Sequence, residues 1–305
     1  MTNLPINLHL RSELGKALEH RSALTPTTTK KLIEAGYNVK IERSPQRIFD
    51  DEEFEKAGAT LVEENTWRDA PTDTIIIGLK ELPVETYLEF LQDDKGRRVA
   101  AFGYHAGFAG AALALENWAW QLTHSTSEPF PSVSSYPNEN ELIADVKKAI
   151  VQGSEKTGKA PRVLVIGALG RCGSGAVDLC LRAGVPNENV IKWDMAETAK
   201  GGPFPEIIES DIFVNCNLNN PIPIYTIATT FDKPTVPVEV KNDPPVTVIS
   251  IDHLPSLLPR EASESFSEAL LPHLLELKHW KQNPVWSRAQ KLFREKVATL
   301  PKSAL

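Results

Sequence analysis

Residues 162–173 read RVLVIGALGRCG, and this stretch decides the fold of the second half of the chain. The apolar run Arg162 to Ile166 predicts a buried strand, and residues 174–183 predict the helix that follows it. Three glycines at intervals of three residues form the turn between them: Gly167, Gly170 and Gly173. Glycine lets the chain turn sharply and lets free N–H groups at a helix start approach negative oxygens. The stretch therefore predicts a dinucleotide site, and the alternative is a tight turn whose glycines serve packing alone.

An acidic residue, Asp194, stands at the end of the next predicted strand, Val190 to Trp193. An acid at this place can accept hydrogen bonds from both ribose hydroxyls of NAD and would repel the additional phosphate of NADP. The expected cofactor is therefore NAD. Within the turn, Arg171 could contact phosphate or could be a solvated loop arginine. Cys172 and Cys216 both follow predicted strands on the same sheet edge. They could lie near each other beside the cofactor, although we interpret them as buried, inert thiols.

The first hundred residues alternate between short strands and helices. Apolar residues predict strands at four places: 6–10, 37–42, 59–62 and 74–79. Thr25 and Pro26 open a helix that ends at Gly36, and residues 54–57 predict a second helix. The apolar run 74–79 is continuous, which is typical of a buried parallel strand. This order of elements indicates a parallel sheet flanked by helices.

The predicted fold class is therefore α/β, with two Rossmann-like domains, parallel sheets flanked by helices and an active-site cleft between them. The Ala- and Gly-rich stretch 102–122 predicts a long helix that leaves the first domain and enters the second. We expect a discontinuous substrate-binding domain, residues 1–101 plus 256–305, and an NAD-binding domain, residues 102–255. Further helices and strands are expected at 138–151, 211–215, 247–251, 263–277 and 285–300.

Composition and charge restrict the kind of partner. The chain has 305 residues and a net charge of −7, whereas nucleic acids and anionic membranes favour a basic surface, so neither is expected. No apolar run reaches transmembrane length. Three cysteines and scattered histidines offer no disulfide framework and no metal-ligand spacing. We expect a monomeric, cytoplasmic protein that binds small molecules and no metal, although Ser303-Ala304-Leu305 weakly resembles a peroxisomal signal.

Two basic residues follow predicted strands of the first domain. Arg21 could clamp a carboxylate with its planar fork, and the alternative is an arginine paired with Glu19. Lys80 follows the run 74–79, where partial burial could lower its pKa and let it serve as a base. The alternative for Lys80 is a surface lysine paired with Glu81.

Arg97 and Arg98 form a second basic pair. Adjacent residues in a strand point to opposite faces, so these two arginines could serve different ligands. His253 follows a predicted strand end and is the histidine that we place near the cofactor, whereas the other histidines are interpreted as structural.

The sequence resembles the fungal saccharopine dehydrogenases, which are NAD-dependent and lysine-forming. The resemblance covers nearly the whole chain, and its last block is the most specific. The matching stretches are LHLR (8–11), EHRSALTP (19–26), IIIGLKE (75–81), GRRVAAFG (96–103), IGALGRCGSG (166–175), KWD (192–194), GGPF (201–204) and SIDHLPSLLPRE (250–261). The family is also similar to alanine dehydrogenase, which shares the opening Arg-x-Ala-Leu-Thr-Pro.

The resemblance implies an oxidoreductase of lysine biosynthesis. Saccharopine gives up a hydride to NAD, the imine takes up water, and the product collapses to lysine and 2-oxoglutarate. The family's acid–base lysine corresponds to Lys80. The resemblance places the substrate carboxylates on Arg21 and Arg98, with Phe102 lining the pocket and with Lys16, Glu19 and Glu89 nearby. The implied NAD contacts are Arg97, Gly167, Gly170, Arg171, Gly173, Asp194, Thr198, Ile251, Asp252, His253 and Leu254.

Two stretches of the family have no counterpart in this sequence. After Pro83 the family continues through a strand that bears its acid–base histidine, whereas this chain reaches Leu88 almost at once. After Cys216 the family has another strand and loop that are also missing. A missing inner strand leaves ladder groups unpaired, so we expect low stability and little turnover, unless Lys80 or a substitute such as His105 carries the proton transfers.

Two other functions stay open. The first is an NAD-binding protein that kept Asp194 and lost the chemistry, which would bind NAD tightly without turnover. The second is a related amino-acid dehydrogenase such as alanine dehydrogenase. Arg97, Arg98 and the block 250–261 favour the saccharopine enzyme over the second alternative.

Overall fold

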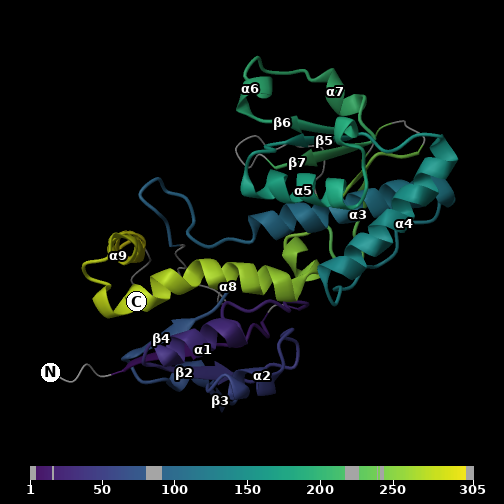
Figure 1. The fold of residues 1–305 in the computed structure, drawn as a ribbon. Coiled ribbons are helices and arrows are strands. Elements are labelled where there is room, and N and C mark those ends of the chain that lie inside the picture. The colour runs from purple at the N-terminus through teal and green to yellow at the C-terminus, as the bar shows by residue number, and fades with distance from the viewer. Residues whose placement is uncertain are drawn as a thin grey trace. The chain divides into compact units, whose positions relative to one another are not determined.

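The computed structural model describes residues 5–15, 17–79, 91–216, 227–238, 240 and 244–299. The chain divides into two compact units (Figure 1). Unit 1 consists of Met1–Ala101 and Pro259–Leu305, and unit 2 consists of Phe102–Leu258. Among the described residues, no helix combines the length and the hydropathy that crossing a membrane requires.

Unit 1 is built on a parallel sheet with the strand order β3-β2-β1-β4. Its strands are β1 (Ile6–Leu10), β2 (Tyr37–Glu42), β3 (Thr60–Val62) and β4 (Thr74–Ile77). The connections between them contain α1 (Pro26–Glu34), α2 (Asp51–Lys56) and a 3-10 turn, η1 (Thr66–Asp69). Leu8 of β1 lies between Val39 of β2 and Ile75 of β4, and its side chain is fully buried. The alternating pattern of the sequence therefore gives one well-packed core.

The end of the chain completes unit 1. It forms α8 (Pro259–Leu275), η4 (Glu276–His279) and α9 (Pro284–Val297). In Figure 1, α8 lies beside α1. Buried hydroxyl groups join the two regions: Thr28 Oγ1 lies 2.6 Å from Ser267 Oγ, and the Ser22 N–H donates to Ser263 Oγ at 2.9 Å. Unit 1 therefore depends on residues that are more than two hundred positions apart in the sequence.

Unit 2 contains a parallel sheet with the order β6-β5-β7. Its strands are β5 (Val163–Ile166), β6 (Val190–Trp193) and β7 (Ile212–Asn215), and a separate antiparallel pair joins β8 (Val236–Pro237) to β9 (Thr247–Val248). The helices and 3-10 turns are α3 (Gly103–Thr123), α4 (Glu139–Thr157), α5 (Arg171–Arg182), η2 (Asn187–Asn189), α6 (Met195–Thr198), α7 (Pro205–Ile208) and η3 (Leu254–Leu257).

Helices α3 and α5 pack side by side, and glycines allow this close approach (Figure 1). A Cβ at Gly107 of α3 would overlap the carbonyl of Cys172, and a Cβ at Gly175 of α5 would overlap the carbonyl of Tyr104. Each helix thus places a residue without a side chain against the backbone of the other. The start of α5, which carries the glycine-rich turn, is fixed in this way on the longest helix of the described part of unit 2.

The expected α/β class, with two parallel sheets flanked by helices, is confirmed. Two details of the strands differ. The run 74–79 forms a strand only as far as Ile77. This strand, β4, is the last in the strand order of the sheet, and Ile76 is 36% exposed. Of residues 247–251, Thr247–Val248 alone form a strand, which pairs antiparallel with β8, and Ile251 forms an isolated bridge to Thr229.

The return of the chain to unit 1 also differs from the expected position at residue 256. Residues 256–258 pack in unit 2, where Leu257 and Leu258 are fully buried in the core. The Leu257 carbonyl accepts from the Tyr136 N–H at 2.8 Å, and the Ser256 carbonyl accepts from the Ser135 hydroxyl at 2.6 Å. These apolar and polar contacts hold the segment until Pro259 begins α8.

Candidate active site

The glycine-rich turn of unit 2 joins β5 to α5. Gly167 has a φ of +84°, which a residue with a side chain rarely adopts. A Cβ at Gly173 would overlap the backbone of Gly167, so the first turn of α5 lies directly on the end of β5. Gly170 is the N-cap residue of α5 and provides no side chain to cap the helix. The turn is exposed, with Leu169 85% accessible, and it therefore suits the phosphate groups of a dinucleotide.

Asp194 lies beside this turn at the end of β6. Its Oδ2 accepts the N–H of Leu169 at 3.0 Å, and its Oδ1 accepts the N–H of Met195 at 2.9 Å. The N–H groups of Gly167 and Ala168 donate to the carbonyl of Trp193, which joins the same two strand ends. Turn and acid are therefore brought together as the spacing in the sequence predicts for an NAD site.

Thr198 lies one helical turn after Asp194, and its hydroxyl donates to the Asp194 carbonyl at 2.9 Å. Arg171 is exposed at the first position of α5. Both residues are therefore held next to the acid and the turn that would bind a nucleotide. Phe102, the N-cap residue of α3, is half-buried in unit 2.

The two cysteines near the turn lie in contact. The sulfur atoms of Cys172 and Cys216 are 2.7 Å apart. The hydrogen bond from Cys216 lowers the pKa of Cys172, and the same contact together with burial raises the pKa of Cys216. Cys172 is therefore the thiol of the pair that ionises first. The two thiols lie near each other, as their positions after two strands of one sheet allowed, and both are half-buried rather than fully buried.

The segment 251–254 lies against other parts of unit 2. Ile251 is buried and forms a parallel bridge with Thr229. His253 is 9% exposed, and its ring lies 4.9 Å from that of Phe231. Asp252 is exposed, and Leu254 begins η3 and lies near Gly110 of α3. The sequence predicts NAD contacts for these residues, and the structure shows them anchored on α3 and on residues 229–231.

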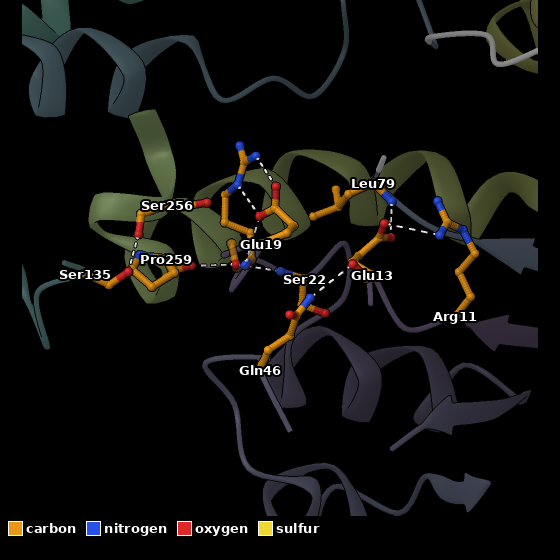
Figure 2. Close-up of polar contacts among 11 residues, drawn as sticks. Arg11, Glu13, Glu19, Ser22, Gln46, Leu79, Ser135, Ser256 and Pro259 are labelled. Carbon is orange, nitrogen blue, oxygen red and sulfur yellow. Dashed lines mark hydrogen bonds and ion pairs between the residues drawn. The ribbon is translucent and has the colours of Figure 1, made fainter. Parts of the chain in front are cut away.

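In unit 1, Arg21 is held by Glu19. Its Nε donates to Glu19 Oε1 at 2.7 Å and its Nη2 donates to Glu19 Oε2 at 2.6 Å, and both side chains are buried (Figure 2). Of the two alternatives that the spacing left open, a substrate clamp or an arginine paired with Glu19, the structure contains the pair. The surrounding cavity, lined by residues of 10–23 with Ser44 and Arg47, holds about 10 Å³, the space of about one water molecule.

A second buried pair was missed by sequence reasoning. Glu13 Oε2 lies 3.2 Å from Arg11 Nη1, and Glu13 Oε1 accepts the N–H of Leu79 at 2.6 Å (Figure 2). A Cβ at Gly78 would lie 2.8 Å from Arg11 Cζ, so the guanidinium packs on the backbone there. Both charged residues lie just after β1, at the carboxyl end of a parallel strand. This position in the sequence could have identified them as candidate site residues. The pair fixes the chain at the end of β4.

The remaining predicted residues of unit 1 are only partly described. Lys16, Lys80 and Glu89 lie outside the described residues. Arg97 is exposed and pairs with Asp93, with Nε 2.9 Å from Oδ2. The Arg97 backbone N–H also donates to Asp93 Oδ1, and this bond, followed by the side-chain bond, lowers the pKa of Asp93. Arg98 is exposed and bridges to Gln92. We expected the two arginines to lie in one regular strand. Arg97 instead lies in the turn that begins at Asp93, so that expectation was wrong.

His105, named above as one residue that could substitute for the missing histidine, lies in the first turn of α3 and is 5% exposed. Its Nε2 lies 3.9 Å from Glu139 Oε1, and burial lowers the pKa of its imidazole. Its ring also contacts that of Tyr104 edge to face. These contacts describe a histidine packed in the core of unit 2.

Comparisons with known proteins agree with this architecture. The family model "Alanine dehydrogenase/PNT, N-terminal domain" matches residues 9–88. A solved L-alanine dehydrogenase superimposes with a TM-score of 0.59 at 16% identity, covering 92% of this chain and 94% of the other. A transhydrogenase from Sinorhizobium meliloti superimposes with a TM-score of 0.56 at 14% identity, covering 92% and 97%. These two likenesses establish the fold.

Closer relatives establish the family. The chain is 58% identical to a saccharopine dehydrogenase (NAD(+), L-lysine-forming) of Neurospora crassa over 99% of both chains. It is 52% identical to the enzyme of the same name from Yarrowia lipolytica, over 96% of this chain and 98% of the other. The chain belongs to the family of NAD(+)-dependent, L-lysine-forming saccharopine dehydrogenases.

The chain is also shorter than the Neurospora relative that it matches. The match to the Neurospora protein extends over 371 aligned positions, whereas this chain has 305 residues. At least 66 positions of the relative (371 minus 305) therefore have no counterpart here. This number agrees with the two missing stretches that the sequence indicates.

Proposed function

We propose that this chain is an oxidoreductase that cleaves saccharopine with NAD and water to lysine, 2-oxoglutarate, NADH and a proton. The observation that carries the proposal is the 58% identity to a relative named for this reaction, over 99% of both chains. Retention of the exposed glycine-rich turn beside Asp194 supports NAD as the cofactor. We assign NAD binding to unit 2 and substrate binding to unit 1.

The residues of unit 2 would hold NAD, which supplies the hydride acceptor when it is bound. The N-terminus of α5 offers N–H groups to the pyrophosphate, and Arg171 lies at its first position. The Asp194 carboxylate would exchange the N–H groups of Leu169 and Met195 for ribose hydroxyls. We also assign Thr198, Arg97 and residues 251–254 to this cofactor.

The residues of unit 1 would bind the substrate. Arg21 and Arg98 would hold its carboxylates, Phe102 of unit 2 would line the pocket, and Lys16, Glu19 and Glu89 would tune the charge. Because Glu19 occupies two nitrogens of Arg21, a substrate carboxylate must compete with an internal carboxylate of the same geometry. Lys80 would be the acid–base residue. Substrate binding at Arg21 is therefore expected to be weak until this pair opens.

The proposal is tested by following NADH absorbance with saccharopine and NAD, with a full-length relative as the positive control. We expect turnover at least a hundredfold below that of the relative, since removing one proton-transfer group costs about two to four powers of ten. Oxidation of alanine in place of saccharopine would contradict the assignment. The Lys80→Met variant should abolish the residual activity.

A second candidate is a chain that binds NAD without turnover. The aligned positions without a counterpart, at least 66, favour it, because the resemblance implies that the family's acid–base histidine belongs to one of the missing stretches. NADH binding by fluorescence titration, together with saccharopine turnover below the detection limit, would support this candidate. Urea unfolding tests the same deletion, and a free energy of unfolding at or above that of ordinary domains, about 5–15 kcal/mol, would refute the expected low stability.

The remaining assignments concern the setting of the reaction. We propose a monomer in the cytoplasm that acts on small molecules and binds neither nucleic acid nor membrane. The net charge of −7 supports the absence of nucleic-acid and anionic-membrane partners, because polyanions favour basic surfaces. The tripeptide Ser303-Ala304-Leu305 lies outside the described residues. Sedimentation of the pure chain would test its oligomeric state.

A further inference from the structure

A groove of about 660 Å³ lies within unit 2, and none of its lining residues belongs to the glycine-rich turn. Three elements form its walls: the second half of α3, the loop 130–137 and one face of α4. The volume is in the range of small-molecule sites, which is about 300–1,000 Å³. The function proposed above uses none of these residues.

Hydrogen bonds fix the loop wall of the groove. The Val133 N–H donates to the Phe231 carbonyl and the Tyr136 N–H donates to the Leu257 carbonyl, each at 2.8 Å. Between them, the Ser135 hydroxyl donates to the Ser256 carbonyl at 2.6 Å (Figure 2). A wall that is already ordered costs little conformational entropy when a ligand binds. The groove is therefore preformed.

A largely buried carboxyl group, that of Glu116, forms one side of the groove. The Tyr136 hydroxyl lies 3.2 Å from Glu116 Oε1 and 3.4 Å from Asp145 Oδ2. Among the described residues, this hydroxyl is the one hydrogen-bond donor to Glu116, so Oε2 is left for a further donor. Burial, together with the negative charge of Asp145, raises the pKa of Glu116 to about 7.

The charges along the groove do not balance. Three carboxyl groups, those of Glu116, Glu141 and Asp145, line it together with one lysine. That lysine, Lys148, already pairs with Asp145 at 2.8 Å. A ligand with a positive charge would relieve the repulsion between Glu116 and Asp145, whereas an anion would increase it.

Aromatic rings form the rest of the lining. The ring of Trp120 stacks on that of His124, with centroids 3.4 Å apart, and meets Phe130 edge to face at 6.2 Å. Such rings bury an alkyl chain well, and their faces attract organic cations. The aromatic surface and the carboxyl groups therefore favour the same kind of ligand.

We propose that this groove binds a small organic cation, namely a primary ammonium group on an alkyl chain, as in a diamine. The ammonium would donate to Glu116 Oε2 and to Asp145, and the alkyl chain would lie along Trp120 and Phe130. A metal ion is disfavoured, because no group of three ligating side chains occurs in the part of the chain that the structure describes. This proposal does not rest on the proposed reaction, since neither saccharopine nor NAD takes part.

The test is calorimetric titration of the full 305-residue chain with cadaverine. We expect saturable binding at one site and none for 1-pentanol, which has the same alkyl chain and no charge. The nearly isosteric Glu116→Gln variant should weaken binding by roughly tenfold, the loss of about 1.4 kcal/mol of a charge-assisted hydrogen bond. The Glu155→Gln variant is the matched control, because this exposed glutamate of α4 does not line the groove.

A second measurement locates the ammonium group. The groups that face Glu116 are Tyr136 and Asp145, and Glu141, Lys148 and His124 lie further along the groove. A cation beside Glu116 favours its ionised form, so binding at pH 7 should release up to roughly half a proton. Titration in phosphate and in MOPS, which differ in ionisation enthalpy and contain no primary ammonium group, measures this release. Release that is absent in Glu116→Gln supports the proposal.

Other results would overturn it. The first is no heat of binding up to about 10 mM cadaverine, which corresponds to a free energy weaker than roughly 3 kcal/mol. The second is unchanged affinity in Glu116→Gln. Tighter binding of penta-lysine than of cadaverine would make a basic segment of another protein the occupant. If Glu116→Gln fails to melt cooperatively, Trp120→Leu replaces it, and unchanged affinity in that variant is equally contrary.

Discussion

In unit 1 the candidate carboxylate clamp, Arg21, is paired with Glu19 inside the protein, whereas in unit 2 the candidate nucleotide site is open to solvent. Glu19 and Arg21 are at most 5% exposed, but Leu169 of the glycine-rich turn is 85% exposed. A ligand of Arg21 must displace an internal carboxylate, whereas a phosphate at the start of α5 meets N–H groups on the surface. The comparison teaches that one site is preformed and that the other must first be opened at a cost.

The largest expected effect is in unit 2. In Gly173→Ala the new Cβ would overlap the backbone of Gly167, so the turn cannot keep its shape. We expect NADH affinity to fall by at least about a hundredfold and stability to fall by roughly 1–3 kcal/mol, as for overpacking. Fluorescence titration measures the first effect. Gly202→Ala is the control, since the nearest atoms lie 3.7–3.8 Å away. Normal NADH binding by Gly173→Ala would contradict the assignment of the glycine-rich turn as the cofactor site.

The next effect is in unit 1. Glu19→Gln leaves the buried guanidinium of Arg21 without its carboxylate, and breaking a buried pair costs about 3–5 kcal/mol. Urea unfolding of the full chain measures the loss. Glu63→Gln removes the partner of an exposed pair, in which Arg43 Nε lies 3.6 Å from the carboxylate, and should cost less than about 1 kcal/mol. Equal effects of the two substitutions would show that Arg21 is not isolated from solvent.

A pH effect distinguishes the buried acid of unit 2 from the paired acids of unit 1. The pKa of Glu116 is about 7 in the folded chain and 4.5 as a free carboxyl, so the folded state binds the proton more tightly. Stability should therefore fall as pH rises from about 4.5 to 7. Glu116→Gln should remove this dependence and be more stable at pH 8 by up to about 3 kcal/mol. Thermal melts at pH 5 and pH 8 test the sign, and a variant less stable at pH 8 would contradict it.

The smallest effect concerns Asp194. Asp194→Asn keeps one oxygen acceptor and loses the charge, so NADH affinity should fall by roughly tenfold, or about 1.4 kcal/mol. The preference for NADH over NADPH should fall as well, because repulsion of the additional phosphate is lost. Parallel titrations with the two nucleotides measure both. An unchanged preference would mean that another residue selects the nucleotide.

Local patterns in the sequence predicted the elements well. Strand periodicity and capping located β1, α1 and β2, and the glycine spacing with Asp194 located the turn of unit 2. These features depend on neighbours in the chain, where the backbone conformation of Gly167 and the polarity of each face are encoded locally.

Long-range features were predicted less well. Sheet order is not encoded in local periodicity, so the apolar run of β4 indicated an inner strand although it ends the described sheet. The pairing of Arg21 stayed open because a clamp and an internal ion pair need the same residues. The Glu13 contact to Leu79 was missed because it joins positions 66 residues apart.

The discontinuity of unit 1 has a consequence for the order of folding on the ribosome. The first hundred residues leave the exit tunnel long before Ser263 and Ser267, to which Ser22 and Thr28 are bonded, have been translated. Unit 2 is contiguous and can be completed while the first segment still waits for its last helices. During that interval the apolar surface of α1 and β2 that α8 later covers is available to chaperones, so newly made chains should depend on them most before translation ends.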